Sequence, residues 1–271
     1  MAAATSAEQT TAARLFERVL VGVDGSEAGR EAAFQGARLV APEGTLELVT
    51  AVYIIEARLQ GWPEERINAA LELEGGPALY AAAAMVGARA TTRLVNGPPR
   101  QVLLDEAERY EATLIAVGSH GHSRLSELLI GGVSGPLLHE APCSILIARP
   151  ATSAALFPMN VVVGIDGSPS SLEALAVGEY VSRRFGVPLR ILLARHGDVD
   201  IVHAELKAPR VEIVDDTPVD ALFDAASARD LLIVGNRGLH GLSTLGSVSE
   251  RVAHKALSSV LVVRARPDAP Q

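Results

Sequence analysis

Short aliphatic runs recur along the chain, and longer segments with helical spacing of apolar residues separate them. The runs Val19–Val23 and Val161–Ile165 are continuous and rich in β-branched residues, which is typical of strands covered on both faces. Each run stops at Asp-Gly-Ser, a turn signal whose serine can cap the next helix. After Ser168, Pro169 suits the first helical position. The pattern therefore predicts strands that alternate with helices.

The same alternation continues through both halves of the chain. Further strands are predicted at Leu46–Val52, Arg93–Val95, Leu189–Leu193 and Val211–Val214. A full helix is predicted at Pro63–Val86, whereas the second half offers only Val199–Lys207 at the matching place, a remnant of that helix. Strands and helices at this rhythm indicate a parallel sheet with helices on both faces.

Three segments occur twice, in the same order. The pairs are Arg18–Ser26 with Asn160–Ser168, Leu114–Gly121 with Leu231–Gly238, and Ser144–Arg149 with Ser259–Arg264. Three ordered matches indicate a duplication. A length of 271 residues also suits two domains of about 100 to 150 residues each.

The duplication places the domain boundaries. We predict domains at 15–150 and 159–266, the second with a reduced second helix, joined by a linker at 151–158. A disordered N-terminal tail is predicted at 1–14 and a C-terminal tail at 267–271. Hydrophobic residues make up 48% of the chain but aromatic residues only 4%, so the core is expected to be aliphatic, as in α/β layers with buried parallel strands.

Charge and composition exclude several functions. A net charge of -8 argues against nucleic acid as a partner. The single cysteine, Cys143, cannot form an internal disulfide, which fits a reducing cytoplasm. The Ala/Thr-rich start lacks the basic and apolar parts of a secretory signal. No uncharged apolar run approaches the roughly 20 residues of a membrane helix. We therefore expect a cytoplasmic protein that does not enter membranes.

Two aspartates end the first strand of each half. Asp24 and Asp166 fall where ligands bind in open parallel sheets, at the carboxyl ends of the strands. A carboxylate there can accept hydrogen bonds from an adenine amino group or a ribose hydroxyl. The alternative is that each aspartate only forms the turn with the glycine that follows it.

A glycine-rich loop follows the fourth predicted strand of each half. In the first half it contains Gly118, Ser119, His120, Gly121, Gly131, Gly132 and Ser134; in the second it contains Gly235, Asn236, Arg237, Gly238, Gly246, Ser247 and Ser249. Glycines let a polyphosphate approach the backbone, and a helix start presents free N–H groups. An ordinary glycine-rich turn is the alternative, but its presence in both halves favours phosphate binding.

The motif order resembles that of the universal stress protein family. A strand-end Asp is followed by Gly-x2-Gly-x9-Gly-[Ser/Thr], a helix and a final aliphatic strand that ends in Arg, and two copies span Leu15 to Arg266. The resemblance implies two tandem doubly wound α/β domains, each with a five-stranded, mainly parallel sheet of the adenine nucleotide alpha hydrolase-like or Rossmann-like kind. It also implies ATP, with or without Mg²⁺, held by the loop residues above together with Gly22, Asp24, Gly164 and Asp166.

Each copy departs from the family pattern. Gly132 stands where the pattern has Ser or Thr, so the first half lacks one hydroxyl. Pro136 is tolerated only in the first helical turn, which predicts that the helix begins at Ser134. The second half keeps Ser247 and a capping-box partner, Glu250. Its loop is two residues shorter, which reshapes or closes the pocket.

Other candidate chemistry is weaker. The loop histidines His120 and His122 are interpreted as exposed residues rather than metal ligands, with His120 near phosphate. No nucleophile elbow, P-loop lysine or paired carboxylates occur. No catalytic or metal-binding residues are therefore assigned.

Three functions follow from these patterns. The first is an ATP-binding stress or regulatory module. The second is an interaction or scaffold protein with degenerate sites that works through dimer surfaces, and the third is an enzyme such as a slow ATPase. The final strands, Ser144–Ala148 and Ser259–Val263, are predicted sheet edges where the two domains pair within the chain as a pseudo-dimer, with or without further homodimerisation.

Overall fold

The computed structural model describes residues 12–87, 90–120, 131–150, 157–194, 211–236 and 247–264. Its first half contains β1 (Arg18–Gly22), α2 (Glu27–Leu39), β2 (Thr45–Val52), α3 (Ile55–Gln60), α4 (Glu64–Val86), β3 (Ala90–Asn96), α5 (Pro99–Arg109), β4 (Leu114–Gly118), α6 (Ser134–Glu140) and β5 (Ser144–Ala148). Its second half contains β6 (Val161–Gly164), α7 (Pro169–Phe185), β7 (Leu189–Ala194), β8 (Val211–Val214), α9 (Pro218–Ala225), β9 (Leu231–Gly235), α10 (Ser247–Lys255) and β10 (Ser259–Val263).

These elements follow the predicted alternation closely. The helix predicted at Pro63–Val86 is α4, and α6 begins at Ser134 as the position of Pro136 predicts. The helical remnant predicted at Val199–Lys207, most of the linker and the C-terminal tail lie outside the described residues. The end of the predicted N-terminal tail, residues 12–14, forms a helical turn, and Ala12 is buried.

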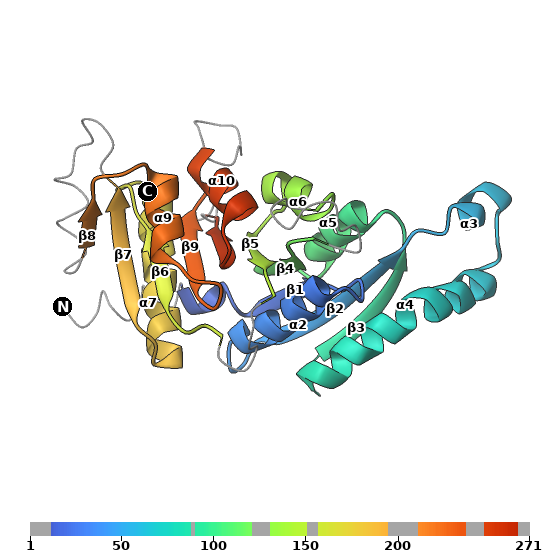
Figure 1. The fold of residues 1–271 in the computed structure, drawn as a ribbon. Helices are drawn as coiled ribbons and strands as arrows, with labels where there is room; N and C mark the ends of the chain where they lie inside the picture. Colours follow the sequence, from blue (N-terminus) through green and yellow to red (C-terminus); the bar gives the residue numbers. More distant parts are fainter. Residues whose placement is uncertain are drawn as a thin grey trace.

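The strands form one sheet in the order β3-β2-β1-β4-β5-β10-β9-β6-β7-β8 (Figure 1). All neighbours are parallel except β5 and β10, which pair antiparallel. Each half thus contributes five parallel strands in the same order, and helices cover both faces. The predicted class of two tandem doubly wound α/β units is confirmed.

The two halves join at their last strands. Leu261 of β10 lies opposite Leu146 of β5, and both side chains are fully buried. The sequence predicts these strands as sheet edges, and in the structure each strand covers the edge of the other. Their unpaired N–H and C=O groups are therefore satisfied within the chain rather than left open to other molecules.

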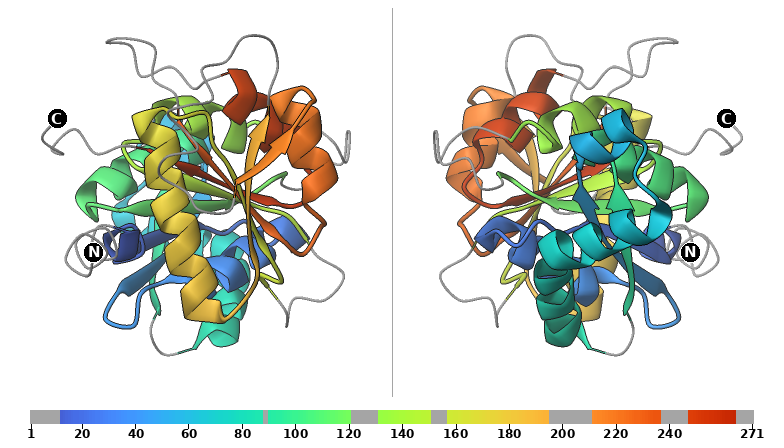
Figure 2. Two further views of the ribbon diagram at one scale, coloured as in Figure 1. Left: turned by 90° about the vertical axis from the view of Figure 1, so that its left-hand side faces the viewer. Right: turned by 90° about the vertical axis from the view of Figure 1, so that its right-hand side faces the viewer.

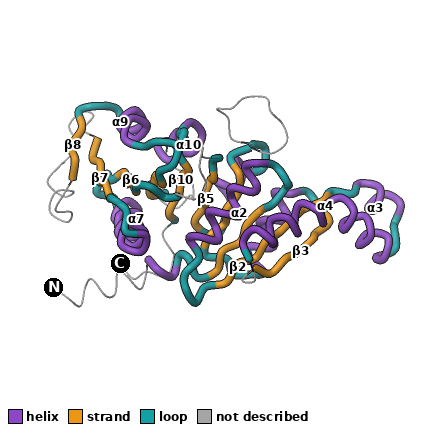
Figure 3. The backbone as a smooth tube through the Cα atoms, turned by 60° about the horizontal axis from the view of Figure 1, so that its bottom comes forward, coloured by secondary structure: helices purple, strands orange, loops and turns teal. Residues whose placement is uncertain are grey.

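Two apolar layers enclose the sheet. On one face α2, α4 and α7 pack on the strands, and these helices lie in front of the sheet in Figure 3. On the other face lie α5, α6, α9 and α10. The views along the sheet show the twisted strands between the two layers (Figure 2), as expected for a sheet of this kind. Among the described residues, no helix combines the length and apolar character that crossing a membrane requires.

The serines predicted as caps start α2 and α7. The Oγ of Ser26 accepts a hydrogen bond from the N–H of Gly29 at 3.0 Å, and the Oγ of Ser168 accepts one from Ser171 at 3.3 Å. Gly25, in the turn before α2, has a φ of 81°, a left-handed conformation that glycine adopts without steric cost. The Asp-Gly-Ser signal therefore sets where both helices begin.

Arg184 of α7 ties the second half to the first. Its guanidinium donates hydrogen bonds to the main-chain carbonyls of Arg38, Leu39 and Val40, at the end of α2. A cation there satisfies orphan carbonyls and complements the negative end of the helix dipole. Nearby, the rings of Phe16 and Tyr180 stack with centroids 5.8 Å apart.

Candidate functional site

Two cavities open at the carboxyl ends of the parallel strands, one in each half. The first has a volume of about 220 Å³ and is lined by Gly22, Val23, Asp24, Gly29, Val49, Ala51, Pro99, Leu103, Val117, Gly118, His120, Gly131, Gly132, Val133 and Ser134. The polar members lie at strand ends and at the start of α6, whereas β2 and α5 supply an apolar wall. One end of the cavity is therefore polar and the other apolar, as in many small-molecule sites.

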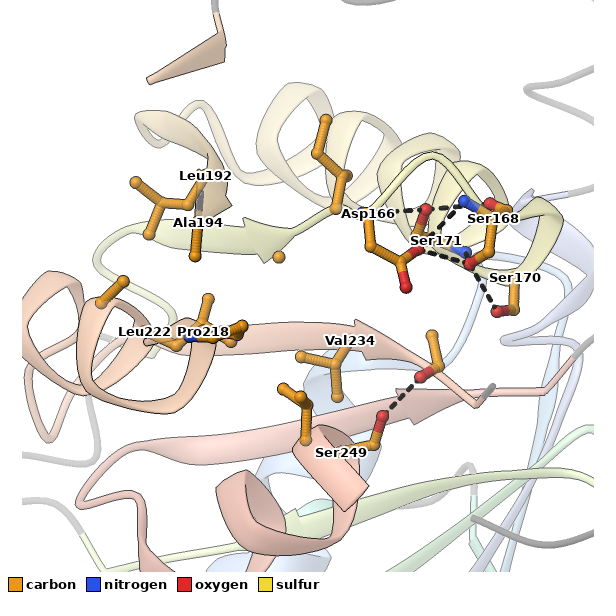
Figure 4. Close-up of a pocket in the computed structure, with 15 residues that line it drawn as sticks. Asp166, Ser168, Ser170, Ser171, Leu192, Ala194, Pro218, Leu222, Val234 and Ser249 are labelled. Atoms are coloured by element: carbon orange, nitrogen blue, oxygen red, sulfur yellow. Dashed lines mark hydrogen bonds between the residues drawn. The ribbon is translucent and has the colours of Figure 1, made fainter. Parts of the chain in front are cut away.

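The second cavity repeats this plan with less space. Its volume is about 100 Å³, and its walls come from the matching elements β6, β7, β9, α7, α9 and α10. In Figure 4, Asp166 and the serines of α7 lie on one side, Leu222 and Pro218 on another, and Ser249 near Val234. The duplication predicted from the sequence thus extends to the architecture of the cavities.

Each strand-end aspartate is held by the serine two residues later. The Oδ1 of Asp24 accepts hydrogen bonds from the N–H of Ser26 at 3.0 Å and from its hydroxyl at 2.6 Å. Asp166 makes the same pair with Ser168, at 3.0 and 2.5 Å. The turn interpretation and the binding interpretation are therefore compatible, because the turn orients a carboxylate that also lines the cavity.

The glycines that end β4 and β9 allow α2 and α7 to approach the strand ends. A Cβ on Gly118 would lie 2.6 Å from the carbonyl carbon of Ala28, and one on Gly235 would lie 2.5 Å from that of Ser170. The first turns of α2 and α7 thus pack directly on these strand ends. Gly132 differs, because a Cβ there would meet nothing within 4 Å, so its glycine leaves open space beside the cavity.

The serines at the start of α6 and α10 bond to the strand ends. The hydroxyl of Ser134 donates to the carbonyl oxygen of Gly118 at 2.6 Å, and that of Ser249 donates to Gly235 at 2.6 Å. In this arrangement each hydroxyl keeps its oxygen as an acceptor while its proton is engaged. The serines therefore fix the starts of α6 and α10 to the ends of β4 and β9, which line the cavities.

The structure brings most of the predicted residues of the first half to one cavity. Ser119 is the exception: it is buried, its Oγ lies 2.9 Å from Nδ1 of His120, and it does not line the cavity. In the second half Gly164, Asp166, Gly235 and Ser249 line the cavity, and Asn236 does not. Gly121, Arg237, Gly238 and Gly246 lie outside the described residues, and Ser247 is described only as the start of α10.

Sequence reasoning misses the apolar wall. Pro99 and Leu103 of α5 line the first cavity, and Pro218 and Leu222 of α9 line the second. The signal is present in the chain, since both helices begin with proline and carry leucine four residues later. It is a local helix-start pattern, however, and only its repetition between the halves relates it to a site.

One substitution between the halves lies beside the strand-end aspartate. Gly29 lines the first cavity, and Ser171 takes the matching place in α7. A Cβ on Gly29 would lie 2.4 Å from the Oδ1 of Asp24. In the second half that side chain is present, and the hydroxyl of Ser171 donates to the carbonyl of Ser168 at 2.9 Å. A side chain at this place would therefore collide with a carboxylate positioned like that of Asp24, so the surroundings of the strand-end aspartate differ between the halves.

Charge also differs between the two sites. Nη1 of Arg30 donates to the carbonyl oxygen of Gly25 at 2.7 Å, which places a cation on the turn that holds Asp24. Leu172 stands at the matching position in the second half. Among the described residues, no three His, Cys, Asp or Glu side chains are grouped to hold a metal ion.

The fold and the paired cavities define a duplicated, doubly wound α/β protein with a cavity at the strand ends of each half. The model of the universal stress protein family matches residues 15–149 and 200–264. Universal stress protein Rv2005c of Mycobacterium tuberculosis is 31% identical over 289 residues, which cover 91% of this chain and 96% of that protein. A universal stress protein of Mycolicibacterium smegmatis is 27% identical over 294 residues, 92% of this chain and 97% of that protein.

Solved structures agree on the fold. The crystal structure of a universal stress protein from Archaeoglobus fulgidus superposes with a TM-score of 0.72 at 21% identity, and the match covers 92% of this chain and 98% of that one. The family match and the mycobacterial relatives show that the chain belongs to the universal stress protein family, as its motifs indicate.

Proposed function

We propose that this protein is an ATP-binding regulatory module whose working site is the cavity of the first half. The observation that carries the proposal is the junction, in one cavity of about 220 Å³, of an oriented carboxylate, a glycine-lined floor and an apolar wall. An adenine ring is flat and largely apolar, with polar edges, and suits the wall formed by Val49, Ala51 and Leu103. The Asp24 carboxylate supplies an acceptor for a ribose hydroxyl or an adenine amino group.

The phosphates would lie at the other end of the cavity. Gly118, Gly131 and Gly132 line that end, and their backbones allow a close approach by phosphate oxygens. The guanidinium of Arg30 on the neighbouring turn adds a positive charge. Mg²⁺ remains part of the prediction and would accompany the phosphates.

The second half is proposed to contribute structure rather than a second ATP site. Its cavity has less than half the volume of the first, and Ser171 occupies the place of Gly29. This assigns the degenerate-site alternative to one half of the chain. The domain boundaries at 15–150 and 159–266 and the intramolecular pseudo-dimer belong to the same proposal, and the β5–β10 pairing supports them.

Calorimetric titration of the purified protein with ATP tests the proposal, with ADP, AMP and a cyclic nucleotide as competitors. Asp24→Asn keeps an oxygen for the Ser26 bonds but replaces the other acceptor with a donor, so we expect affinity to fall about tenfold or more. Asp166→Asn is the matched control and should bind as the wild type does. No heat with millimolar ATP, and no nucleotide released when the protein is denatured, would refute nucleotide binding.

A further inference from the structure

The last repeated segment of each half ends in an arginine that reaches into the other half. Arg149 follows β5, and its Nη2 donates to the main-chain carbonyls of Ala253 and His254 of α10, at 2.9 and 3.0 Å. Arg264 follows β10, and its Nη2 donates to the carbonyl of Leu138 of α6. Both α6, whose start lines the first cavity, and α10, whose start lines the second, are thus bound near the C-terminal end by an arginine from the opposite half.

The same arginines are fixed to their neighbours by crossed serine bonds. The N–H of Arg149 donates to the Oγ of Ser259 at 3.0 Å, and the N–H of Arg264 donates to the Oγ of Ser144 at 3.0 Å. Each serine begins the antiparallel partner strand. These bonds tie each arginine to the start of the partner strand, and the contacts are reciprocal, as in a two-fold symmetric interface.

Hydrogen bonds continue from each arginine to the cavity of its own half. The N–H of Ser119, between the cavity residues Gly118 and His120, donates to the carbonyl of Ala148 at 2.9 Å. The N–H of Asn236 makes the matching bond to Val263 at 2.7 Å. A shift of either strand end therefore displaces the residue directly before the arginine.

The N-terminal ends of α6 and α10 complete the chain of hydrogen bonds between the two cavities. Ser134 and Ser249 line the two cavities at the helix starts and donate to Gly118 and Gly235. Starting from the first cavity, the connections run through Arg149 and α10 to the second cavity. From there they return through Arg264 and α6.

Burial of Arg149 strengthens its attachment to α10. The residue is 8% exposed, and desolvation lowers its pKa to about 10. Its charge is balanced by carbonyls at the negative end of α10, so separating the two would leave a buried cation without compensation. Among the described residues its Nη1 has no hydrogen-bond partner, which leaves the two α10 bonds to hold the guanidinium.

We propose that Arg149 and Arg264 couple the two cavities, so that a ligand in the first cavity stabilises α10, which lines the second, and a ligand in the second stabilises α6, which lines the first. For its ligand this inference rests on the proposed ATP site in the first half. Coupling then runs from that site through Arg149 to α10. Both arginines act as positioning residues, because neither lines a cavity.

Amide hydrogen exchange of the full chain, with and without ATP, tests this coupling. We expect ATP to slow exchange in α10 of the wild type, although α10 belongs to the other repeat. Arg149→Met should raise α10 exchange about fivefold or more without ligand and should abolish its response to ATP, while ATP affinity in the first cavity stays within about threefold. Arg264→Met should raise exchange in α6 instead. Arg183→Met, on the exposed face of α7, is the control.

The outcomes separate the two proposals. If wild-type protein binds no ATP, the proposed function fails, and the exchange of unliganded Arg149→Met still decides whether the arginine holds α10. Exchange in α10 that is unchanged in this variant, or that rises no more than in α4, would overturn the coupling, as would an ATP response that survives the substitution. If Arg149→Met does not fold, Arg149→Lys, which keeps the charge but loses the planar fork, is expected to give the same changes at smaller size.

Discussion

The two cavities differ at single glycine and serine positions. Gly29 lets the Asp24 carboxylate approach α2 closely, whereas Ser171 carries a side chain at the matching place, and Gly132 lacks the hydroxyl that the family pattern has. The strand-end aspartates and the glycine loops could be predicted as candidate binding residues, because an aspartate that ends a strand and a glycine-rich loop after a strand are recognisable in the sequence. The effect of Ser171 could not be predicted, since it depends on how closely a helix approaches a carboxylate.

A methyl group at the end of β4 is expected to destabilise the fold. In Gly118→Ala the new Cβ would lie within 2.6 to 2.8 Å of Ala28, so α2 must move away from the sheet, at a cost of about 2–3 kcal/mol. Urea unfolding measures this change. Gly132→Ala has open space and should stay within about 0.5 kcal/mol of the wild type. Equal effects of the two substitutions would contradict this packing.

Glu31 makes the stability depend on pH. Desolvation raises its pKa above the usual 4.5, more than the hydrogen bond from Gln35 lowers it. The folded state therefore favours the protonated acid, and this contribution to stability is present below the unfolded pKa and is lost as pH rises through the folded pKa.

Glu31→Gln removes that loss, because an amide does not ionise. We expect the variant to unfold at a higher temperature than the wild type at pH 7, with the difference shrinking as pH falls through the raised pKa of Glu31 and absent below about 4.5. Thermal unfolding across pH 3.5 to 8 measures it, and Glu108→Gln, at an exposed site on α5, serves as the control. A difference that grows toward acid pH would refute this account.

At the scale of elements, the helix ends carry the contacts between the halves. The strands and helices were predictable because buried parallel strands and capped helices leave strong local patterns. The arginine contacts were not, since Arg184 joins α7 to the end of α2 across more than 140 residues of sequence, and no local pattern indicates the partner.

Replacing Arg184 tests the contribution of these contacts. Arg184→Met keeps much of the side-chain volume but loses three charged hydrogen bonds to the end of α2, and we expect about 2–3 kcal/mol of lost stability in urea unfolding. Arg183→Met, one residue earlier, breaks only an exposed pair with Glu179 and should cost about 0.5 kcal/mol or less. Similar losses for both would show that the α2 contacts contribute little.

At the scale of the whole molecule, a duplicated chain has become a single sheet with unequal halves. The repeated segments predicted the duplication, the final strands were predicted to pair the two halves, and the structure adds that the pairing is antiparallel, through β5 and β10. The difference in cavity volume between the halves depends on the side chains around each cavity. In the sequence it was visible only as departures from the repeat.

Filling one cavity at a time tests the central claim most directly. Ala51 and Ala194 stand at matching places on β2 and β7 and line the first and second cavities. In calorimetric titrations with ATP, we expect wild-type protein and Ala194→Phe to bind one equivalent per chain, and Ala51→Phe to bind none. Binding that survives Ala51→Phe and is lost in Ala194→Phe would place the nucleotide in the second half and contradict this account.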